Sequence, residues 1–121
     1  MSDSEAIPVL DLGVVDALRA LDEGSGPGLF EELVDLFVTD SVAHVRALES
    51  ALASGDARLL ERSAHTLKSS SASLGAMQLS ELCRALEQAG RTNVLDGAVD
   101  LVRAASDACQ RACKALGEVR A

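Results

Sequence analysis

The fold is decided by residues 64–76, which read AHTLKSSSASLGA. Residues three or four positions apart are neighbours on a helix, so Lys68 and Ser69 flank His65 on one helix face. At about 100° per residue, a neighbouring stripe of the same helix contains Leu60, Ala64, Leu67, Ser71 and Leu74. The sequence therefore predicts an amphipathic helix that buries this stripe and leaves His65 exposed beside it.

The helix that carries His65 is flanked by helix-ending and helix-starting signals. Asp56 can cap its first turn, and Gly75 marks its end. On the N-terminal side, apolar residues recur at helical spacing from Phe30 to Ala53, which predicts one long helix ended by Gly55. The stretch SGPG at residues 25–28 breaks the chain before that helix.

A short helix is predicted before this break. Asp11 can cap it, and Val14, Leu18 and Leu21 are expected to point inward. The first ten residues are expected to form a flexible lead. We therefore place a single domain at residues 11–118.

Two further helices are predicted after Gly75. In the first, Gly90 is expected to be the C-terminal stop, and an apolar face is formed by Leu79, Leu82, Cys83, Leu86 and Ala89. Asn93 is expected to cap the second, whose apolar stripe extends to Leu116. Four long helices with connections of about two to five residues imply antiparallel neighbours. The predicted fold is all-α, an up-down-up-down four-helix bundle with the short N-terminal helix across one end.

Composition limits the class of protein. The chain has 121 residues, of which 48% are hydrophobic, enough for one buried core filled by Leu, Val and Ala, because Trp and Tyr are absent. A net charge of −8 argues against nucleic acid as a partner. The acidic start and the lack of an apolar run near ~18 residues argue against a secretory signal and a membrane span. We expect a cytoplasmic protein with no membrane partner.

The three cysteines, Cys83, Cys109 and Cys113, are an odd number without a Cys-x-x-Cys pair. They therefore do not suggest a zinc site, and we predict no metal ligands in this chain. We interpret them as small buried hydrophobic residues or surface thiols, with a redox or metal role as the alternative.

The motif around His65 resembles the hallmark of the histidine-containing phosphotransfer (HPt) domains, H-x-L-K-G-S-S-x-x-L-G. The matching residues are His65, Leu67, Lys68, Ser70, Ser71, Leu74 and Gly75. Ser69 stands where the family usually has glycine, and serine is the next smallest polar choice. The family often places a glutamine on the following helix near the phosphoryl group. This chain has Glu87 there, and we do not assign it that role, because a carboxylate repels a phosphoryl oxygen.

The resemblance implies that His65 accepts a phosphoryl group from a receiver-domain aspartate and passes it to another receiver in a bacterial-type two-component phosphorelay. An exposed imidazole is largely neutral at cellular pH and so retains a nucleophilic nitrogen, and Lys68 supplies a cation for the arriving anion. Glu61, one turn before His65, can orient the ring. The expected docking surface is Glu61, Ser69, Ala72, Ala76 and Met77, extended by exposed apolar residues of the second helix; the expected structural residues are Leu67, Ser71, Leu74 and Gly75.

The chain contains no Gly-x-x-x-x-Gly-Lys phosphate loop, so we expect a phosphoryl carrier without its own ATP site or cofactor, not an enzyme. Mg²⁺ is expected on the partner receiver domain. The expected partners are response-regulator receiver domains and a hybrid sensor histidine kinase, and we expect a monomer. Met1 and the polar ends favour a stand-alone chain over a piece of a larger kinase.

Other functions remain open at this stage. The main alternative is a non-catalytic helical adaptor that binds receiver domains or other signalling proteins. An enzyme with its own substrate pocket ranks last. His44, the second histidine, has no lysine one turn later and is interpreted as structural.

Overall fold

Helices account for most of the computed structural model, which describes residues 7–25 and 28–120. The described residues contain no strand. The helices are α1 (Leu12–Ser25), α2 (Leu29–Ser54), α3 (Ala57–Ser73), α4 (Met77–Thr92) and α5 (Ala98–Arg120). The all-α class expected from the sequence is confirmed.

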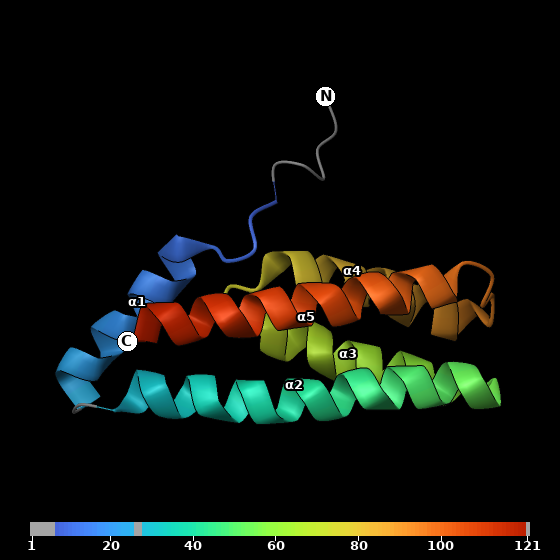
Figure 1. Cartoon of the computed structure of the whole chain (residues 1–121), viewed down its shortest axis with the longest axis horizontal. Helices are drawn as coiled ribbons and strands as arrows, with labels where there is room; N and C mark the ends of the chain where they lie inside the picture. The colour runs from blue at the N-terminus through green and yellow to red at the C-terminus, as the bar shows by residue number, and fades with distance from the viewer. Residues whose placement is uncertain (1–6, 26–27, 121) are drawn as a thin grey trace.

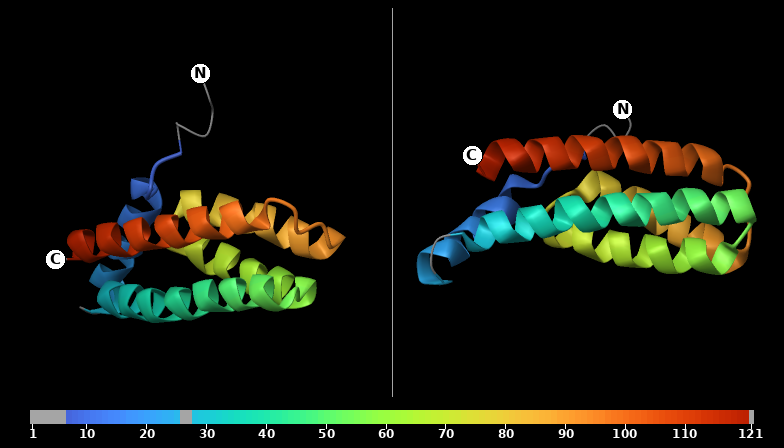
Figure 2. Two further views of the ribbon diagram at one scale, coloured as in Figure 1. Left: turned by 45° about the vertical axis from the view of Figure 1, so that its right-hand side comes forward. Right: turned by 60° about the horizontal axis from the view of Figure 1, so that its bottom comes forward.

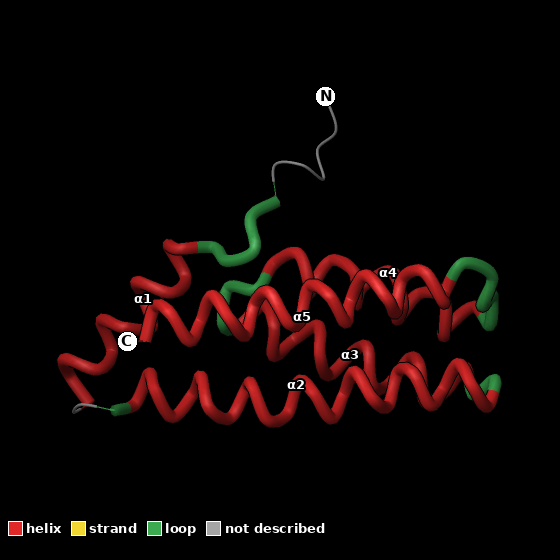
Figure 3. Tube along the Cα trace, in the orientation of Figure 1, coloured by secondary structure: helices red, strands yellow, loops and turns green. Residues whose placement is uncertain are grey.

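Helices α2 to α5 form an antiparallel bundle in which the chain runs up, down, up and down (Figure 1). Each helix packs on the next one in sequence, and α5 returns to pack on α2. Short turns join them at the two ends (Figure 3). Helix α1 lies across the end where α2 begins, as both views of Figure 2 show. The predicted four-helix bundle with an extra N-terminal helix is therefore correct.

The ends of α3 follow the local signals in the sequence. The Asp56 carboxylate accepts a hydrogen bond from the backbone N–H of Leu59 at 3.0 Å, as an N-cap does. After Leu74 the chain turns at Gly75, whose φ is 79°. A Cβ at Gly75 would lie 2.9 Å from the carbonyl oxygen of Asp11, so the start of α1 can approach only a glycine here.

Leucine and alanine dominate the core, with Phe30 and Phe37 as its aromatic members. The largest fully buried leucines are Leu48, Leu60, Leu67, Leu79, Leu86 and Leu116. This composition agrees with the core expected from the sequence. Among the described helices, none is both long and apolar enough to cross a membrane.

Three local expectations are wrong. Helix α4 continues through Gly90 to Thr92, and Asn93, with φ 56°, is its left-handed C-cap instead of the N-cap of the last helix. In α1, Leu21 is exposed and Val15 is buried in its place. The rotation of α1 is set by its contacts with the end of the bundle, which local periodicity does not contain.

Packing of the chain begins before residue 11. The side chain of Leu10 is buried in the core. The Gln78 amide donates a hydrogen bond to the carbonyl oxygen of Ile7 at 2.6 Å. Residues 7–10 therefore belong to the packed domain, whereas residues 1–6 of the expected flexible lead lie outside the described residues.

Candidate functional site

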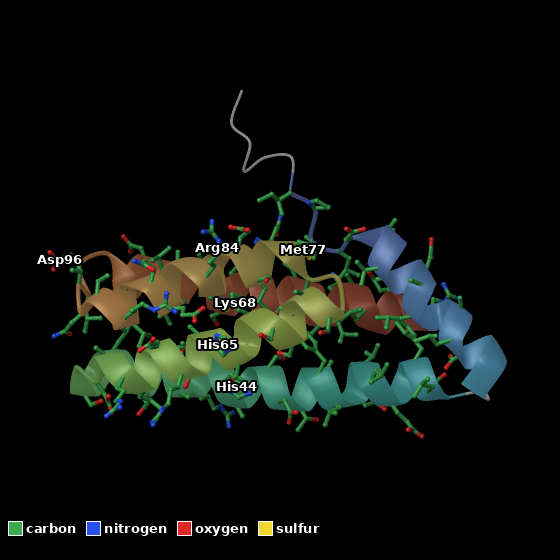
Figure 4. The ribbon with its side chains drawn as sticks, turned by 180° about the vertical axis from the view of Figure 1, so that it is seen from behind. His44, His65, Lys68, Met77, Arg84 and Asp96 are labelled. Atoms are coloured by element: carbon green, nitrogen blue, oxygen red, sulfur yellow. The ribbon has the colours of Figure 1, made fainter. Side chains whose placement is uncertain are left out.

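His65 lies in the middle of α3 with its side chain 60% exposed, and Lys68 lies one turn later on the same helix (Figure 4). Nδ1 of His65 lies 2.8 Å from Oε2 of Glu87 on α4. One ring nitrogen of an exposed histidine is therefore already occupied by a partner from the neighbouring helix. The expected position of His65 at the surface is confirmed.

Glu87 is the centre of a buried ionic cluster. Its side chain is 7% exposed, and Oε1 accepts a hydrogen bond from Nζ of Lys68 at 2.6 Å. Oε2 also accepts from Nη2 of Arg91 at 3.1 Å. The hydrogen bond from Lys68 holds the pKa of the Glu87 carboxyl below its ordinary value, and that from His65 acts in the same direction, although burial opposes them. Glu87 is therefore an ionised acceptor near neutral pH.

The ionised state of Glu87 determines the tautomer of His65. A carboxylate can only accept hydrogen bonds, so Nδ1 must carry a proton to bond with it. In the neutral ring the lone pair then remains on Nε2. The cluster therefore presents Nε2 of His65 as the free nucleophilic nitrogen.

Helix α4 is held close to α3 around this cluster. The Ser80 hydroxyl donates to the backbone carbonyl of Lys68 at 3.1 Å. At the other side of Glu87, a Cβ on Gly90 would lie 2.7 Å from both the carbonyl oxygen of Ala57 and the backbone nitrogen of Glu61. The two helices can come this close only because Gly90 has no side chain.

A hollow of about 580 Å³ opens beside the His65 ring. Arginine side chains from two helices line it, namely Arg58 and Arg62 of α3 and Arg91 of α4. Nε of Arg91 also lies 3.4 Å from Oε2 of Glu61. The surroundings of His65 are thus rich in cations, although the chain as a whole carries a net charge of −8.

Comparison with known proteins finds a family model and solved structures that match most of this chain. The Hpt domain family model matches residues 32–118. The chain belongs to the Hpt domain family. The crystal structure of histidine-containing phosphotransfer protein B from Pseudomonas aeruginosa PAO1 is similar, with 32% identity and a TM-score of 0.84 over 93% of this chain and 95% of that chain.

A rice histidine-containing phosphotransfer protein has the same fold, with a TM-score of 0.79 at 22% identity over 90% of this chain and 79% of that one. No curated protein matches this sequence significantly. The family membership inferred from the motif is therefore confirmed by the family model and by the Pseudomonas aeruginosa relative.

The role of Glu87 in this Hpt domain differs from the expectation. Glu61 was expected to orient the histidine ring, but its carboxylate pairs with Arg91, and Glu87 bonds to the ring instead. The carboxylate is on the Nδ1 side of the ring, and Lys68 and Arg91 compensate its charge. The one available signal was the position of Glu87 where the family often has a glutamine.

The expected docking residues lie in different environments in this Hpt domain. Ser69 is exposed, and Glu61, Ala72 and Met77 are partly exposed, so they remain candidates. In Figure 4, Met77 lies toward the α3–α4 turn, farther from His65 than Lys68 does. Ala76 is fully buried, so its assignment to the docking surface is wrong. The turn that follows Gly75 directs this residue into the core.

The expected apolar extension of the docking surface would be formed by exposed residues of helix α2. Leu36 and Val42 are its exposed large hydrophobic residues, with 59% and 43% of their surfaces accessible. Their part in docking stays a prediction.

The structural motif residues are buried as expected, namely Leu67, Ser71, Leu74 and Gly75. Ser71 was expected to bond back to the helix backbone, but within the described residues its buried hydroxyl has no hydrogen-bond partner. The neighbouring Ser70 makes that bond instead, to the carbonyl of Leu67 at 3.2 Å. His44 is half-buried on α2, and its structural role stays a prediction.

Two of the three cysteines of this Hpt domain, Cys109 and Cys113, lie on α5, and Cys83 lies on α4 one turn before Glu87. Cys83 is buried, and burial raises the pKa of its thiol to about 12. The hydrogen bond from Cys109 lowers the pKa of the half-buried Cys113 thiol, although burial opposes this effect, and the Ser41 hydroxyl 3.6 Å away also lowers it. Within residues 7–25 and 28–120, no group of three or more His, Cys, Asp or Glu side chains is arranged to hold a metal ion.

Proposed function

We propose that this protein accepts a phosphoryl group on Nε2 of His65 from the aspartyl phosphate of a receiver domain, and passes it to the aspartate of another receiver domain in a phosphorelay. The observation that carries the proposal is the 2.8 Å contact between Nδ1 of His65 and Oε2 of Glu87. This contact fixes the proton on Nδ1 and leaves Nε2 free on an exposed ring.

The transfer step needs no proton movement within this protein. The Nε2 lone pair attacks phosphorus, the P–O bond to the aspartate breaks, and the leaving carboxylate takes the bonding electron pair. Because Nδ1 keeps its proton, the imidazole ring gains a positive charge. The Glu87 carboxylate, 2.8 Å from Nδ1, stabilises that charge as it develops.

Lys68 supplies a cation on the same side of α3. Its side chain is 29% exposed and lies 2.6 Å from Oε1 of Glu87, so it can turn from the carboxylate to a phosphoryl oxygen. Mg²⁺ is expected on the partner's receiver domain, where it balances the charge of the aspartyl phosphate. The partners would be response-regulator receiver domains and a hybrid sensor histidine kinase.

The decisive experiment mixes the purified protein with a phosphorylated receiver domain and Mg²⁺. The expected product carries an acid-labile, base-stable phosphoryl group that mass spectrometry maps to His65. Binding to several receiver domains without any labelling would instead support the alternative function, a helical adaptor that uses the same face without chemistry.

Lys68→Ala is expected to slow transfer to and from His65 by about tenfold. A charge-assisted hydrogen bond contributes about 1.5–3 kcal/mol when it is shielded and less when it is exposed, and about 1.4 kcal/mol corresponds to a factor of ten in rate. Quench-flow measurement with a labelled receiver gives the rate. Lys114→Ala, on the exposed side of α5, is the matched control and should transfer normally. Equal rates for the Lys68 variant with several receivers would refute the electrostatic role.

Glu87→Gln is expected to keep the ring oriented but to remove the charge that stabilises the protonated Nδ1. Transfer from the phosphorylated histidine should then fall off at a lower pH than in the unchanged protein, because the carboxylate that favours the protonated ring is gone. The measurement is the pH profile of transfer to a receiver, recorded for both proteins. Superimposable profiles would show that Glu87 only places the ring.

A further inference from the structure

The hollow beside His65 contains arginines that the protein itself does not neutralise. Arg91 is paired with Glu61 and Glu87. In the part of the chain that the structure describes, the guanidinium groups of Arg58 and Arg62 have no ion-pair or hydrogen-bond partner. The three arginines that line the hollow outnumber its two glutamates, in a chain with 19 acidic and 11 basic side chains.

Arg58 and Arg62 are well placed to contact a protein that reaches His65. Both are exposed and belong to α3, one helical turn apart and on the same side as the histidine. A guanidinium group offers a planar fork of donors that fits a carboxylate with two parallel hydrogen bonds. The guanidinium groups of Arg58 and Arg62, one helical turn apart, can therefore bind two carboxylates on the surface of a partner protein.

We propose that Arg58 and Arg62 select, as partners, receiver domains with surface carboxylates next to their phosphoaccepting aspartate. This inference rests on the proposed phosphotransfer function of His65. The acidic residues in the rest of the chain affect which partners these arginines attract. A net charge of −8 repels an acidic partner, but at physiological salt the interaction between exposed charges more than about 8 Å apart is largely screened. For a partner bound beside His65, attraction to Arg58 and Arg62 is therefore stronger than repulsion by the distant acidic residues.

The charge argument predicts the sign of the salt effect. If local attraction dominates, added salt should slow transfer from an acidic receiver, because screening weakens the contact with Arg58 and Arg62. Repulsion by the net charge would have the opposite effect, with transfer becoming faster as salt is added. The effect should appear mainly in KM and the association rate, because neither arginine contacts the reacting atoms.

The test compares two double variants of the full chain with the same change in charge. Arg58→Glu/Arg62→Glu reverses the free arginines of the hollow, and Arg46→Glu/Arg103→Glu reverses two exposed arginines that line the groove between α2 and α5. Glutamate at position 58 lies in the first turn of α3, where a negative charge is favourable for the helix. Circular dichroism checks that both variants are folded.

For each protein, the rate of transfer from a phosphorylated receiver is divided by the rate of labelling with phosphoramidate, a small donor that needs no docking surface. The expected ratio falls about tenfold or more for Arg58→Glu/Arg62→Glu, with a lost or reversed salt effect, and by less than about twofold for Arg46→Glu/Arg103→Glu. An unchanged ratio in the first variant, or equal losses in both, would overturn the selective role. If no receiver labels even the unchanged protein, the proposed function fails and this inference fails with it.

Discussion

The His65→Gln variant is expected to take up no acid-labile phosphoryl group from any receiver domain and to keep the helical content of the unchanged protein. Glutamine has no nucleophilic ring nitrogen, so the step at Nε2 has no substitute. Its amide N–H₂ can still donate to Glu87, and the side chain at this position is largely exposed, so the bundle should fold normally. Labelling by a phosphorylated receiver, with circular dichroism on the same sample, measures both parts.

His44→Gln is the matched control for this experiment. It removes the other histidine of the chain, on α2, without touching the Glu87 cluster. We expect normal labelling of this variant. Labelling that persists in His65→Gln and disappears in His44→Gln would transfer the phosphoacceptor role to His44 and contradict the proposed function.

The fold was largely predictable because its boundaries depend on local signals. Asp56, Gly55 and Gly75 act on neighbouring backbone atoms, and each lies where the sequence placed the end of a helix. The motif at His65 and Lys68 depends on the spacing of residues on a single helix. Both kinds of feature can be recognised without any knowledge of how helices pack together.

The features that the sequence did not predict depend on contacts between helices. The hydrogen bond between Glu87 and His65 joins residues 22 positions apart in the sequence. The same carboxylate also pairs with Lys68 and Arg91. In isolation, a carboxylate near a phosphoryl site suggests repulsion. Only the packed structure shows that this carboxylate faces Nδ1 of His65 and is paired with Lys68 and Arg91.

The role of Gly90 also depends on a contact between helices that the sequence does not reveal. Near the expected end of a helix, glycine suggests a C-terminal stop, yet Gly90 is inside α4. Its function depends on the distance to α3, because a Cβ would meet the backbone of Ala57 and Glu61. The residue therefore fixes the spacing of the two helices one turn after Glu87.

Gly90→Ala is accordingly expected to destabilise the protein, although helix propensity alone predicts the opposite. Alanine in a helix interior is favoured over glycine by about 1 kcal/mol. The new Cβ would lie 2.7 Å from backbone atoms of α3, which cannot rotate away as a side chain can. Overpacking of this kind costs about 1–3 kcal/mol, so we expect a net loss in the free energy of unfolding, measured by urea denaturation.

Gly117→Ala provides the matched control, because Gly117 also lies inside a helix, α5, and a Cβ there would meet no atom within 4 Å beyond its chain neighbours and the backbone of its own helix. This variant should be more stable than the unchanged protein, so the same substitution is expected to have opposite signs at the two positions. Gly90→Ala should also slow phosphoryl transfer, because separation of α3 and α4 draws Glu87 away from Nδ1 of His65. Stabilisation by both substitutions, with normal transfer, would show that the close approach at Gly90 does not hold the Glu87 carboxylate against the histidine ring.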